Sequence, residues 1–306
     1  MSTQDSVSIL LPVYNGSSFI EEQVRSIMGQ SYDNFTLMIR DNCSEDRTVD
    51  IVSSLAKQYE KITLLKSSKN IGILGSISQL IDAVGGAPYI MLADGDDVWL
   101  RDKVALTMKH MKSLENRYGV NTPCLIHTDL KVVDRSLNVI SPSFLDYTKL
   151  NPKKDKLHNL LCQNIVTGCT LMMNRRLLTL AKPIPPEAVM HDWWIALAAS
   201  AFGVIGFVPS ATMLYRQHGN NDTGAKKYGL SAYFRYKKFN TNEQIIAQTE
   251  AFIGRYERNL SEAQRELLKS FIRFKKANTF QKAYLMYKHG FQKHGFFRNC
   301  REVFSS

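Results

Sequence analysis

Three carboxylates lie within four residues in the segment Asp94-Gly-Asp96-Asp97, directly after an apolar run at residues 89–93. Neighbouring carboxylates repel one another, so they coexist only when a cation binds them or when one of them takes up a proton. Oxygen ligands of this kind suit Mg²⁺ or Mn²⁺, which proteins hold with one or two carboxylates while substrate phosphates complete the shell. The segment therefore predicts a site for a divalent cation and a phosphorylated ligand.

A simpler interpretation of the same acids is a solvated turn that leads into a helix capped by Asp97 or Asp102. Both interpretations can hold if they apply to different acids. Asp94 and Asp96 are then the metal-side pair, whereas Asp97 caps a helix that begins at Trp99. Other polar residues along the chain favour the metal site, and the elements that position them explain why.

The chain before these acids alternates between short apolar runs and amphipathic segments. Runs at residues 7–13, 35–39, 62–65 and 89–93 have the length and composition of buried strands, and helical spacing follows the first three, near residues 19–27, 48–59 and 76–84. Strands and helices that alternate in this way form right-handed βαβ units in a mostly parallel sheet. We therefore expect an α/β fold with a Rossmann-like central sheet flanked by helices.

A polar residue follows each predicted strand, namely Asn15, Asp41, Asn70 and Asp94. A single strand-ending Asp is usually a helix cap, but the carboxyl ends of parallel strands share one edge, where open α/β sheets bind ligands. These side chains should therefore form a pocket that a nucleotide could occupy. No Gly-x-Gly-x-x-Gly follows the first strand and no Gly-x-x-x-x-Gly-Lys-Ser/Thr occurs, which removes the main support for dinucleotide-binding and P-loop proteins.

The second half of the chain is expected to add four strands and a helix around further polar residues. Strands are expected at residues 124–133 and 164–173, and a helix at residues 157–163. Thr167 and Gly168 lie within the second of these strands, where a glycine marks either a close backbone approach or a simple β-bulge. Two further strands are expected at residues 204–208 and 213–217, and the second contains Arg216. His218 follows it, and without other evidence this residue would be interpreted as a surface histidine.

A further helix is expected to open at His191-Asp192-Trp193-Trp194. The helix dipole stabilises an acid in the first turn, so Asp192 could be a cap and nothing more. Two adjacent tryptophans are unusual beside a mere cap, because aromatic faces also stack on sugars. This segment is therefore a second candidate for chemistry.

Four motifs stand in a defined order: Pro12-Val-Tyr14-Asn15, Asp41-Asn-Cys-Ser-Glu-Asp46, Asn70-Ile-Gly72 and Asp94-Gly-Asp96-Asp97-Val-Trp99. Their order and spacing resemble the nucleotide-binding half of family 2 glycosyltransferases with the GT-A fold, and the resemblance covers about residues 5–220. It implies a GT-A type catalytic domain that transfers a sugar from a nucleoside diphosphate. It also implies a role for each residue that matches.

In the nucleotide half, the resemblance implies that Asp94 and Asp96 form the Asp-x-Asp motif that holds Mn²⁺ or Mg²⁺ on the diphosphate. Asp41 would contact the edge of the base. Asn42 departs from the family, which often has a second Asp there, and this leaves the contacts to base and ribose open. The other substrate-binding positions that the match implies in this half are Pro12, Tyr14, Asn15 and Asn70.

In the second half, the resemblance implies that Asp192 is the general base, which takes the proton from an acceptor hydroxyl. His191 would orient Asp192 or face solvent, His218 would join the metal or pyrophosphate shell, and Arg216 would neutralise phosphate. A single in-line displacement of this kind inverts the anomeric centre. The remaining positions expected to contact substrate are Thr167, Gly168, Trp193 and Trp194.

The net charge of +11 is confined to the end of the chain, because residues 225–306 carry 17 Lys and Arg against 6 Asp and Glu, while residues 1–224 carry 22 of each. We therefore expect a catalytic domain at residues 1–224, with a nucleotide-sugar half at about 1–120 and an acceptor half at about 121–224. Residues 225–306 form a basic region that is expected to be mainly helical. An acidic partner such as an anionic lipid or a nucleic acid suits such a region.

Helical patterns in the basic region run from about residue 243 to 258 and from 261 to 288. One interpretation is an appendage that packs on the catalytic domain with a solvated basic face. The other places basic and aromatic residues, among them Lys275, Lys282, Phe291 and Phe296, on an anionic membrane. The membrane would suit an acceptor carried on a lipid diphosphate.

Cysteine usage and hydropathy indicate the compartment. The five cysteines show no Cys-x-x-Cys spacing, which favours neither a disulfide framework nor a zinc site. The sequence shows no basic-then-apolar leader, and no apolar run approaches the ~20 residues that cross a bilayer. We therefore expect a cytoplasmic protein, peripheral on the inner face of a bacterial cytoplasmic membrane.

The sequence thus predicts a metal-dependent, inverting glycosyltransferase that adds one sugar to a lipid-linked oligosaccharide in O-antigen or capsule synthesis. The resemblance is strongest to the rhamnosyltransferase type, so dTDP-L-rhamnose is the first donor expected and a UDP-hexose the second. A missing Gln-x-x-Arg-Trp element indicates a non-processive enzyme. The alternatives are a sugar-phosphate nucleotidyltransferase, which lacks its glycine-rich first loop here, and a non-catalytic nucleic-acid-binding protein. No nucleic acid is expected, because the acidic edge would repel phosphate polymers.

Overall fold

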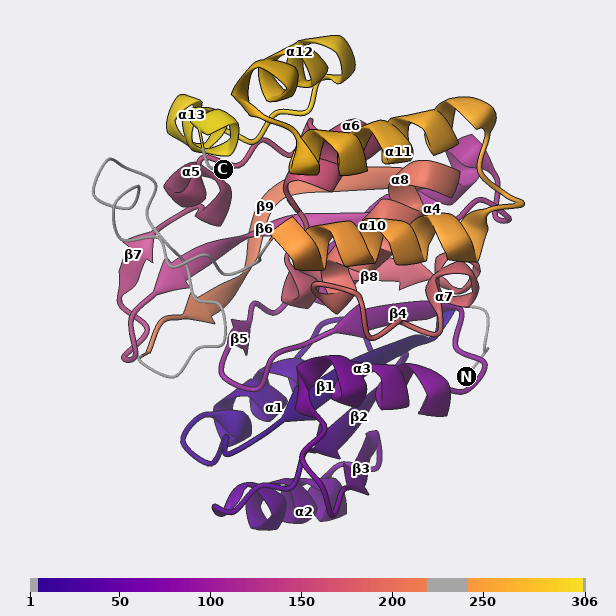
Figure 1. Ribbon diagram of the computed structural model, residues 1–306. Helices are drawn as coiled ribbons and strands as arrows, with labels where there is room; N and C mark the ends of the chain where they lie inside the picture. Colours follow the sequence, from indigo (N-terminus) through magenta and orange to yellow (C-terminus); the bar gives the residue numbers. More distant parts are fainter. Residues whose placement is uncertain (1–4, 219–241, 305–306) are drawn as a thin grey trace.

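One twisted sheet organises the chain in the computed structural model, which describes residues 5–218 and 242–304. The strand order is β3-β2-β1-β4-β8-β6-β9-β5, and β7 pairs with β6 beside this path. Helices cover both faces of the sheet (Figure 1). The domain boundary predicted at residues 224/225 lies outside the described residues.

The first half of the sheet is parallel, as predicted. Strand β1 pairs with β2 and β4, and β2 pairs with β3, all in parallel. The strands are β1 (Val7–Val13), β2 (Phe35–Asp41), β3 (Ile62–Lys66) and β4 (Tyr89–Leu92). The connecting helices are α1 (Ile20–Met28), α2 (Thr48–Gln58) and α3 (Gly72–Ala83). This arrangement brings the carboxyl ends of β1, β2 and β4 to one edge.

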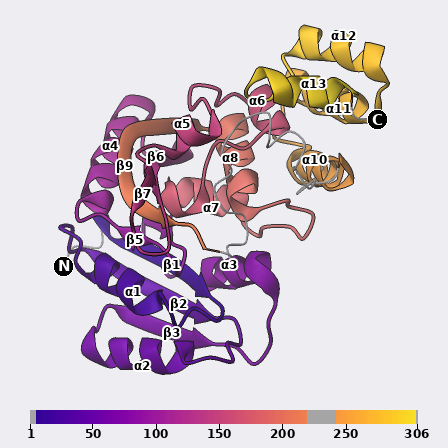
Figure 2. The same ribbon diagram turned by 90° about the vertical axis from the view of Figure 1, so that its left-hand side faces the viewer.

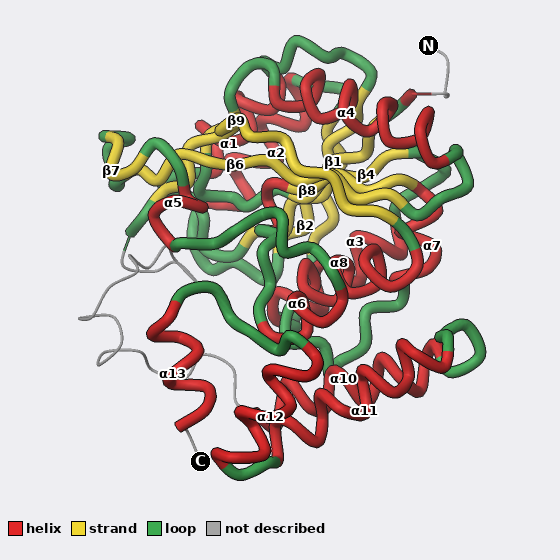
Figure 3. The backbone as a smooth tube through the Cα atoms, turned by 90° about the horizontal axis from the view of Figure 1, so that it is seen from above, coloured by secondary structure: helices red, strands yellow, loops and turns green. Residues whose placement is uncertain are grey.

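The second half of the sheet is mixed. Strand β8 is antiparallel to both β4 and β6, whereas β6 and β9 run parallel. A single strand β9 replaces the two separate strands expected there, and register shifts near Asp129 accompany its bend around the sheet (Figure 3). The strands are β5 (Val98–Trp99), β6 (Cys124–Val133), β7 (Val139–Ser141), β8 (Leu171–Asn174) and β9 (Val204–Arg216).

Two local predictions were wrong. Trp99 does not begin a helix, because residues 98–99 pair with β9 as β5, and helix α4 (Lys103–Tyr118) starts after Asp102. Residues 164–173 are not one strand, because Gly168–Thr170 form a 3₁₀ turn before β8 begins. The remaining helices of this half are α5 (Phe144–Thr148), α6 (Leu157–Cys162), α7 (Arg175–Ala181) and α8 (His191–Phe202).

Two hydrophobic clusters pack the core. One contains side chains from α1, α2 and α4, and the other contains side chains from α3, α7 and α8. Helix α8 is apolar around its whole circumference and is buried from residue 193 to 199, as expected for a helix covered on every side. Helix α8 therefore holds the residues of its first turn in a fixed position. No described helix has the length and apolar character needed to span a membrane.

The first of the described C-terminal helices, formed by residues 242–256, packs beside α8 (Figure 2). The ring of Phe252 lies 5.3 Å from that of Trp194, edge to face. The single helix predicted at residues 261–288 is two helices, because Asn278 forms a capping box with Gln281 and starts a new one. The capping box predicted for Ser261 and Gln264 is confirmed. The four helices are α10 (Asn242–Tyr256), α11 (Glu262–Lys276), α12 (Thr279–His289) and α13 (Phe296–Phe304).

Candidate active site

A cavity of about 710 Å³ lies at the carboxyl edge of β1, β2 and β4 and extends to the first turn of α8. Most of the predicted site residues contribute to its wall. Those that do are Pro12, Tyr14, Asn15, Asn70, Asp94, Asp96, Thr167, Gly168, His191, Asp192 and His218. The predicted residues that are not part of the wall are Asp41, Trp193, Trp194 and Arg216.

The loop after β1 is tied to the loop after β2. The Asn15 side-chain oxygen accepts a hydrogen bond from the backbone of Glu45 at 2.9 Å, and the Asn15 backbone donates to the Ser44 hydroxyl at 2.9 Å. Asn15 has a φ of 47°, a left-handed conformation that Asn tolerates better than most residues. The loops therefore hold Tyr14, which is 48% exposed, at the mouth of the cavity.

The position of Asp41 corrects the prediction that it contacts the base. Its Oδ2 atom accepts hydrogen bonds from the backbone N–H groups of Cys43 and Ser44, both at 3.1 Å, and the residue is buried. Cys43 has a φ of 67°, so the carboxylate stabilises a tight turn. Asp41 shapes the loop, and the next residue, Asn42, reaches the cavity wall instead.

Asn42 and Asn70 form a second polar contact between neighbouring loops. The Asn42 amide nitrogen donates to the Asn70 side-chain oxygen at 2.7 Å. The Asn42 oxygen accepts from Arg40 at 2.9 Å and from the backbone of Ile71 at 3.0 Å. An Asp in place of Asn42 would lack the donor to Asn70. The departure from the family motif is therefore accommodated by an amide network.

The three acids of the opening motif occupy different environments. Asp94 and Asp96 line the cavity, whereas Asp97 lies beneath them and is fully buried. Burial, with Asp96 and Asp94 as neighbouring charges, raises the pKa of Asp97 well above its usual value. The Asp97 Oδ1 atom accepts the backbone N–H of Arg216 at 3.1 Å. Asp97 thus joins two strands and does not cap a helix, contrary to the prediction.

His218 and Asp96 meet in the cavity although they are far apart in sequence. The Nε2 atom of His218 lies 2.9 Å from Oδ2 of Asp96. The His218 ring also stacks on Phe19 with a centroid distance of 4.8 Å. The stacking fixes the plane of the imidazole, so its nitrogen is held toward the carboxylate.

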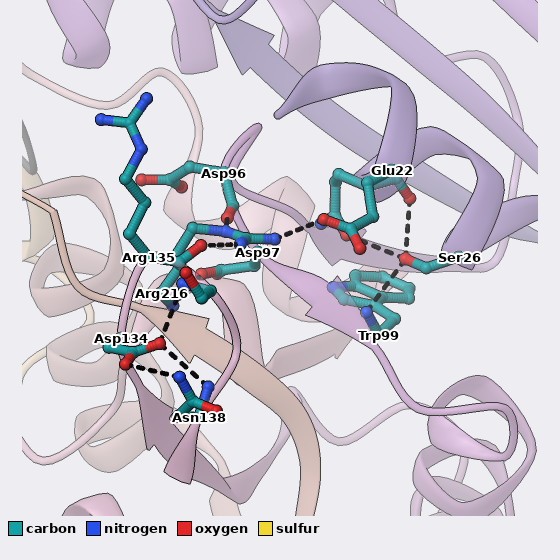
Figure 4. Close-up of polar contacts among 11 residues, drawn as sticks. Glu22, Ser26, Asp96, Asp97, Trp99, Asp134, Arg135, Asn138 and Arg216 are labelled. Carbon is teal, nitrogen blue, oxygen red and sulfur yellow. Dashed lines mark hydrogen bonds and ion pairs between the residues drawn. The ribbon is translucent and has the colours of Figure 1, made fainter. Parts of the chain in front are cut away.

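Arg216 is a structural residue in this conformation, which corrects its predicted phosphate contact. Its guanidinium is buried and donates to the Asp96 carbonyl at 2.8 Å, to the Arg135 carbonyl at 2.5 Å and to Glu22 at 2.5 Å (Figure 4). It also lies over the Phe19 ring, 4.8 Å from the centroid. Arg216 therefore joins three segments around the acids.

Arg135 is the cavity-lining arginine that the sequence analysis missed. It belongs to the turn between β6 and β7, where Asp134 accepts backbone hydrogen bonds from Ser136 and Asn138. It is the sole Arg or Lys among the described residues that line the cavity. In Figure 4 its side chain extends on the same side of the turn as Asp96. The Asp-x-Ser-x-Asn pattern could have predicted the turn, but not its position over the cavity.

Asp192 lies on the wall of the cavity formed by α8, next to the 3₁₀ turn. Its Oδ2 atom accepts the backbone N–H of Gly168 at 3.0 Å, and its Oδ1 atom has no hydrogen-bond partner in the described structure. Burial raises the pKa of Asp192 above its usual value, against opposing effects of His191 and of backbone N–H groups. A carboxylate on the cavity wall can accept a proton from a ligand hydroxyl.

His191 and Gly168 pack against each other behind Asp192. A Cβ atom on Gly168 would lie 2.9 Å from Nε2 of His191, so the close approach requires glycine. Burial lowers the pKa of His191, with Asp192 acting in the opposite direction. His191 is buried and does not face bulk solvent, and its Nδ1 atom has no hydrogen-bond partner in the described structure.

Trp193 and Trp194 are core residues, which corrects the prediction that they contact substrate. Both side chains are buried. The indole N–H of Trp193 donates to the Leu160 carbonyl at 2.6 Å, and that of Trp194 donates to the Ala181 carbonyl at 2.9 Å. Their large apolar area anchors α8, and through it Asp192, to the rest of the core.

The donor atoms present fit a divalent cation at the cavity face of the acids. Asp94 and Asp96 offer carboxylate oxygens there, and His218 offers a ring nitrogen beside Asp96. Ligand atoms of Asp94, Asp97 and Cys169 also lie within 4.8 Å of one another. Burial raises the pKa of the Cys169 thiol well above its usual value, and a protonated thiol is a poor ligand for Mg²⁺ or Mn²⁺. The cavity-facing set is therefore the better match.

A buried lysine accompanies the acids. Lys103 donates to the Thr212 hydroxyl at 3.2 Å and lies 4.8 Å from the centre of the Trp99 ring. Burial lowers its pKa to about 8, while Cys169, Asp97 and Asp94 act in the opposite direction. This internal cation offsets part of the negative charge beneath the cavity.

Comparison with known proteins agrees with this arrangement. The family model described as "Glycosyl transferase family 2" matches residues 8–178. The putative teichuronic acid biosynthesis glycosyltransferase TuaG of Bacillus subtilis is 26% identical over 76% of this chain and 87% of its own length. The dTDP-rhamnosyl transferase RfbG of Shigella flexneri is 25% identical over 74% of this chain and 77% of its own.

A solved structure shares the fold. The mannosyltransferase PcManGT of Pyrobaculum calidifontis, in complex with GDP-Man and Mn²⁺, superposes with a TM-score of 0.58 at 15% identity, over 94% of this chain and 76% of its own. The predicted α/β fold of the GT-A type is confirmed.

Proposed function

Since the chain belongs to glycosyl transferase family 2, we propose that it transfers a single sugar from a nucleoside-diphosphate sugar to a hydroxyl of a growing bacterial surface polysaccharide. The observation that carries this proposal is one cavity in which Asp94 and Asp96 share a wall with Asp192. The acids suit a metal-bound diphosphate, and Asp192 suits a base. Family membership leaves the nucleotidyltransferase and nucleic-acid-binding alternatives without support.

The proposed metal is Mn²⁺ or Mg²⁺, held by Asp94, Asp96 and His218. When bound, such an ion neutralises negative charge on the diphosphate of the donor and of the departing nucleotide. The support for these ligands is their position in the cavity and the contact of 2.9 Å between His218 and Asp96. Arg216 acts indirectly, because its hydrogen bond to the Asp96 carbonyl fixes the backbone of a ligand.

Arg135 takes the role that the sequence analysis gave to Arg216. A guanidinium pairs well with phosphate oxygens and keeps its charge at all relevant pH values. As the sole described Arg or Lys on the cavity wall, Arg135 is the residue suited to contact the diphosphate. Asn15, Asn42 and Asn70 supply amide groups for the nucleoside on the opposite wall.

Asp192 is the proposed general base. The Gly168 N–H holds one carboxylate oxygen, and the second oxygen is buried without a hydrogen-bond partner in the described structure. The carboxylate takes the proton of the acceptor hydroxyl as the hydroxyl oxygen attacks the anomeric carbon. A single displacement of this kind inverts the anomeric centre, and one addition per acceptor makes the enzyme non-processive.

The proposed donor is dTDP-L-rhamnose, with a UDP-hexose as the second choice. The motifs around His191 and His218 and the likeness to a dTDP-rhamnosyl transferase support the first. The acceptor proposed is a lipid-linked oligosaccharide of the O-antigen or capsule type, met at the cytoplasmic face of the bacterial membrane. The likeness to a teichuronic acid biosynthesis enzyme supports a surface polysaccharide in general.

A donor screen tests the proposal. Calorimetric titration of the protein with dTDP-L-rhamnose, UDP-hexoses and GDP-mannose, with and without Mn²⁺, is repeated on Asp96→Ala. One nucleotide sugar should bind in a metal-dependent manner to the natural protein and much more weakly to the variant. If no donor binds, or if binding is indifferent to both the metal and Asp96, the proposal is wrong.

A further inference from the structure

Helix α12 turns its aromatic side chains outward and Lys282 inward. Phe280 and Tyr287 are 88% and 89% exposed and Tyr284 is 61% exposed, whereas Lys282 of the same helix is 3% exposed. The three rings recur at i, i+4 and i+7, so they lie along one face of the helix. Surface helices normally turn such a face to the core. We call Phe280, Tyr284 and Tyr287 the aromatic stripe.

The aromatic stripe lies at the periphery of the molecule. Figures 1 and 2 both show α12 at the outer edge of the C-terminal helices, on the far side of α11 from the sheet. A flat surface could reach the stripe there without meeting the catalytic half. Single exposed apolar residues are common on proteins, but a contiguous row of large rings marks an interaction surface.

The charge around the stripe is entirely positive in sequence. Residues 267–301 contain nine Lys and Arg and no Asp or Glu. Lys288 lies over the Tyr284 ring at 5.9 Å. Lys276, the last residue of α11, is 62% exposed at its side chain and lies 3.9 Å from the exposed carboxylate of Glu250. Lys275 is used internally, since it pairs with Glu302. Lys288 can meet an acidic partner directly, and Lys276 can do so by exchanging its exposed ion pair with Glu250, because such surface pairs are weak.

We propose that the aromatic stripe docks the protein on an anionic membrane surface. Tyrosine and phenylalanine rings with adjacent lysines are the residues that partition to the level of lipid headgroups. In this arrangement the rings enter the headgroup layer while Lys276 and Lys288 contact lipid phosphates. A second copy of the chain fits less well, because it would bring equally basic surfaces together.

The proposed membrane face differs in part from the one expected from the sequence alone, in which Phe296 was named and is 74% exposed. Lys275, Lys282 and Phe291 were expected to contact lipid, but all three are buried and cannot do so. The structure places Phe280, Tyr284 and Tyr287 outside instead. This inference concerns a surface apart from the cavity, so it can fail while the proposed transfer reaction stands.

Vesicle cosedimentation of the full chain tests the inference. The natural protein should sediment at low salt with vesicles of phosphatidylcholine and phosphatidylglycerol, less at high salt, and not with phosphatidylcholine alone. The variant Phe280→Ser/Tyr284→Ser/Tyr287→Ser should bind at least ~10-fold more weakly. Lys276→Gln/Lys288→Gln should lose roughly 25-fold, because each basic residue near an anionic surface contributes about fivefold.

Two matched controls separate the stripe from general effects. Tyr118→Ser removes an exposed ring beside Arg117 on α4, and Lys57→Gln/Lys109→Gln removes two exposed lysines elsewhere. Both should bind vesicles like the natural protein, and all variants should keep its unfolding temperature and nucleotide binding. The inference is overturned if the natural protein ignores anionic vesicles, or if the stripe variant binds them unchanged. A dimer that the stripe variant abolishes, without vesicle binding, would assign the stripe to a second copy.

Discussion

The side chains of Asp96 and His218 are separated by 122 positions in sequence and by 2.9 Å in space. Phe19 stacks on the His218 ring, and Arg216 donates a hydrogen bond to the Asp96 carbonyl. Contacts outside the pair therefore hold both partners in place. The pair therefore presents one carboxylate and one imidazole to the same small volume. A bound cation would replace the hydrogen bond between the two side chains, and the contacts that hold them close together favour such a site.

The first prediction concerns the metal. Asp96→Asn and His218→Ala should each weaken Mn²⁺-dependent nucleotide binding by about 10- to 100-fold, because each removes or misorients a ligand. Calorimetric titration of the donor nucleotide with and without Mn²⁺ measures this loss. His110→Ala, on helix α4 and outside the cavity wall, is the control and should bind normally. Unchanged metal dependence in both site variants would remove the pair from the metal site.

The second prediction separates the two arginines. Arg135→Gln should lower kcat/KM for the donor roughly 10- to 100-fold, since a charge-assisted hydrogen bond contributes about 1.5–3 kcal/mol. Its unfolding temperature should not change. Arg216→Gln should instead destabilise the fold by about 2 kcal/mol or more, because buried acceptors lose their donor.

Steady-state kinetics and thermal unfolding of both arginine variants check this prediction. Arg135 sits on the cavity wall, whereas the Arg216 guanidinium contacts Glu22 and two backbone carbonyls. A normal donor KM and kcat in Arg135→Gln would show that the diphosphate is neutralised elsewhere. A fully stable Arg216→Gln would contradict the structural role of that residue.

The third prediction is a pH dependence set by Asp192. Its pKa is raised by burial, so the carboxylate is protonated, and inactive as a base, at pH values where an exposed aspartate is still ionised. The rate should therefore fall as the pH drops through a value above the usual range for Asp. The pH profile of kcat under saturating donor measures this limb. Asp192→Asn should keep donor binding and lose transfer, and retained turnover would exclude Asp192 as the base.

The sequence predicted the parallel half of the fold well, because its strands and helices are encoded by local periodicity. Residues 7–13 and 124–133 have the predicted bounds. The residues that converge on the cavity were found for the same reason, since parallel strands place their carboxyl ends together. Local signals also sufficed for the Ser261 capping box.

The errors arose where long-range packing decides. From the sequence, Trp193 and Trp194 were expected to contact substrate beside Asp192. The fold instead covers α8 on all sides and turns both rings into the core. Arg216 read as a phosphate ligand, but Glu22 and two carbonyls from distant segments enclose it. Arg135 carries no motif, so only the folded position of its turn identifies it. Burial and enclosure by distant segments are not encoded in local spacing.

The fourth prediction concerns Gly168 as a positioning residue. An added methyl group would lie 2.9 Å from His191 Nε2 and 3.6 Å from the Asp192 carboxylate, so Gly168→Ala should displace the base. We expect kcat to fall by ~10- to 100-fold with donor affinity unchanged, since misplacement by about 1 Å costs that much. Gly254→Ala, where a Cβ would meet no atom within 4 Å, is the control. Equal loss of donor affinity in Gly168→Ala would indicate general damage to the cavity.

The fifth prediction concerns the stability of the C-terminal helices. Glu302 on α13 pairs with Lys275 on α11, and with Lys293 at 2.5 Å, and all but Lys293 are almost fully buried. These ammonium groups lower the pKa of Glu302 to about 2, although burial acts in the opposite direction. Lys275 also has a lowered pKa, because its own burial outweighs the attraction of Glu302. The fold therefore favours the charged form of Glu302 and disfavours the charged form of Lys275, so Glu302 determines the pH dependence in acid.

The sign of the resulting pH dependence follows from the carboxylate. The pKa of Glu302 in the folded protein lies below the unfolded value of 4.5, so its ionised carboxylate stabilises the fold at pH values above 4.5. This stabilisation is lost as the pH falls toward about 2. Glu302→Gln should therefore lower the urea midpoint strongly at pH 7, and the difference from the natural protein should shrink toward pH 3. Glu266→Gln, which removes an exposed ion pair with Arg273, should leave the midpoint nearly unchanged. A pH-independent difference for Glu302→Gln would mean that lost packing, and not the ion pair, is responsible.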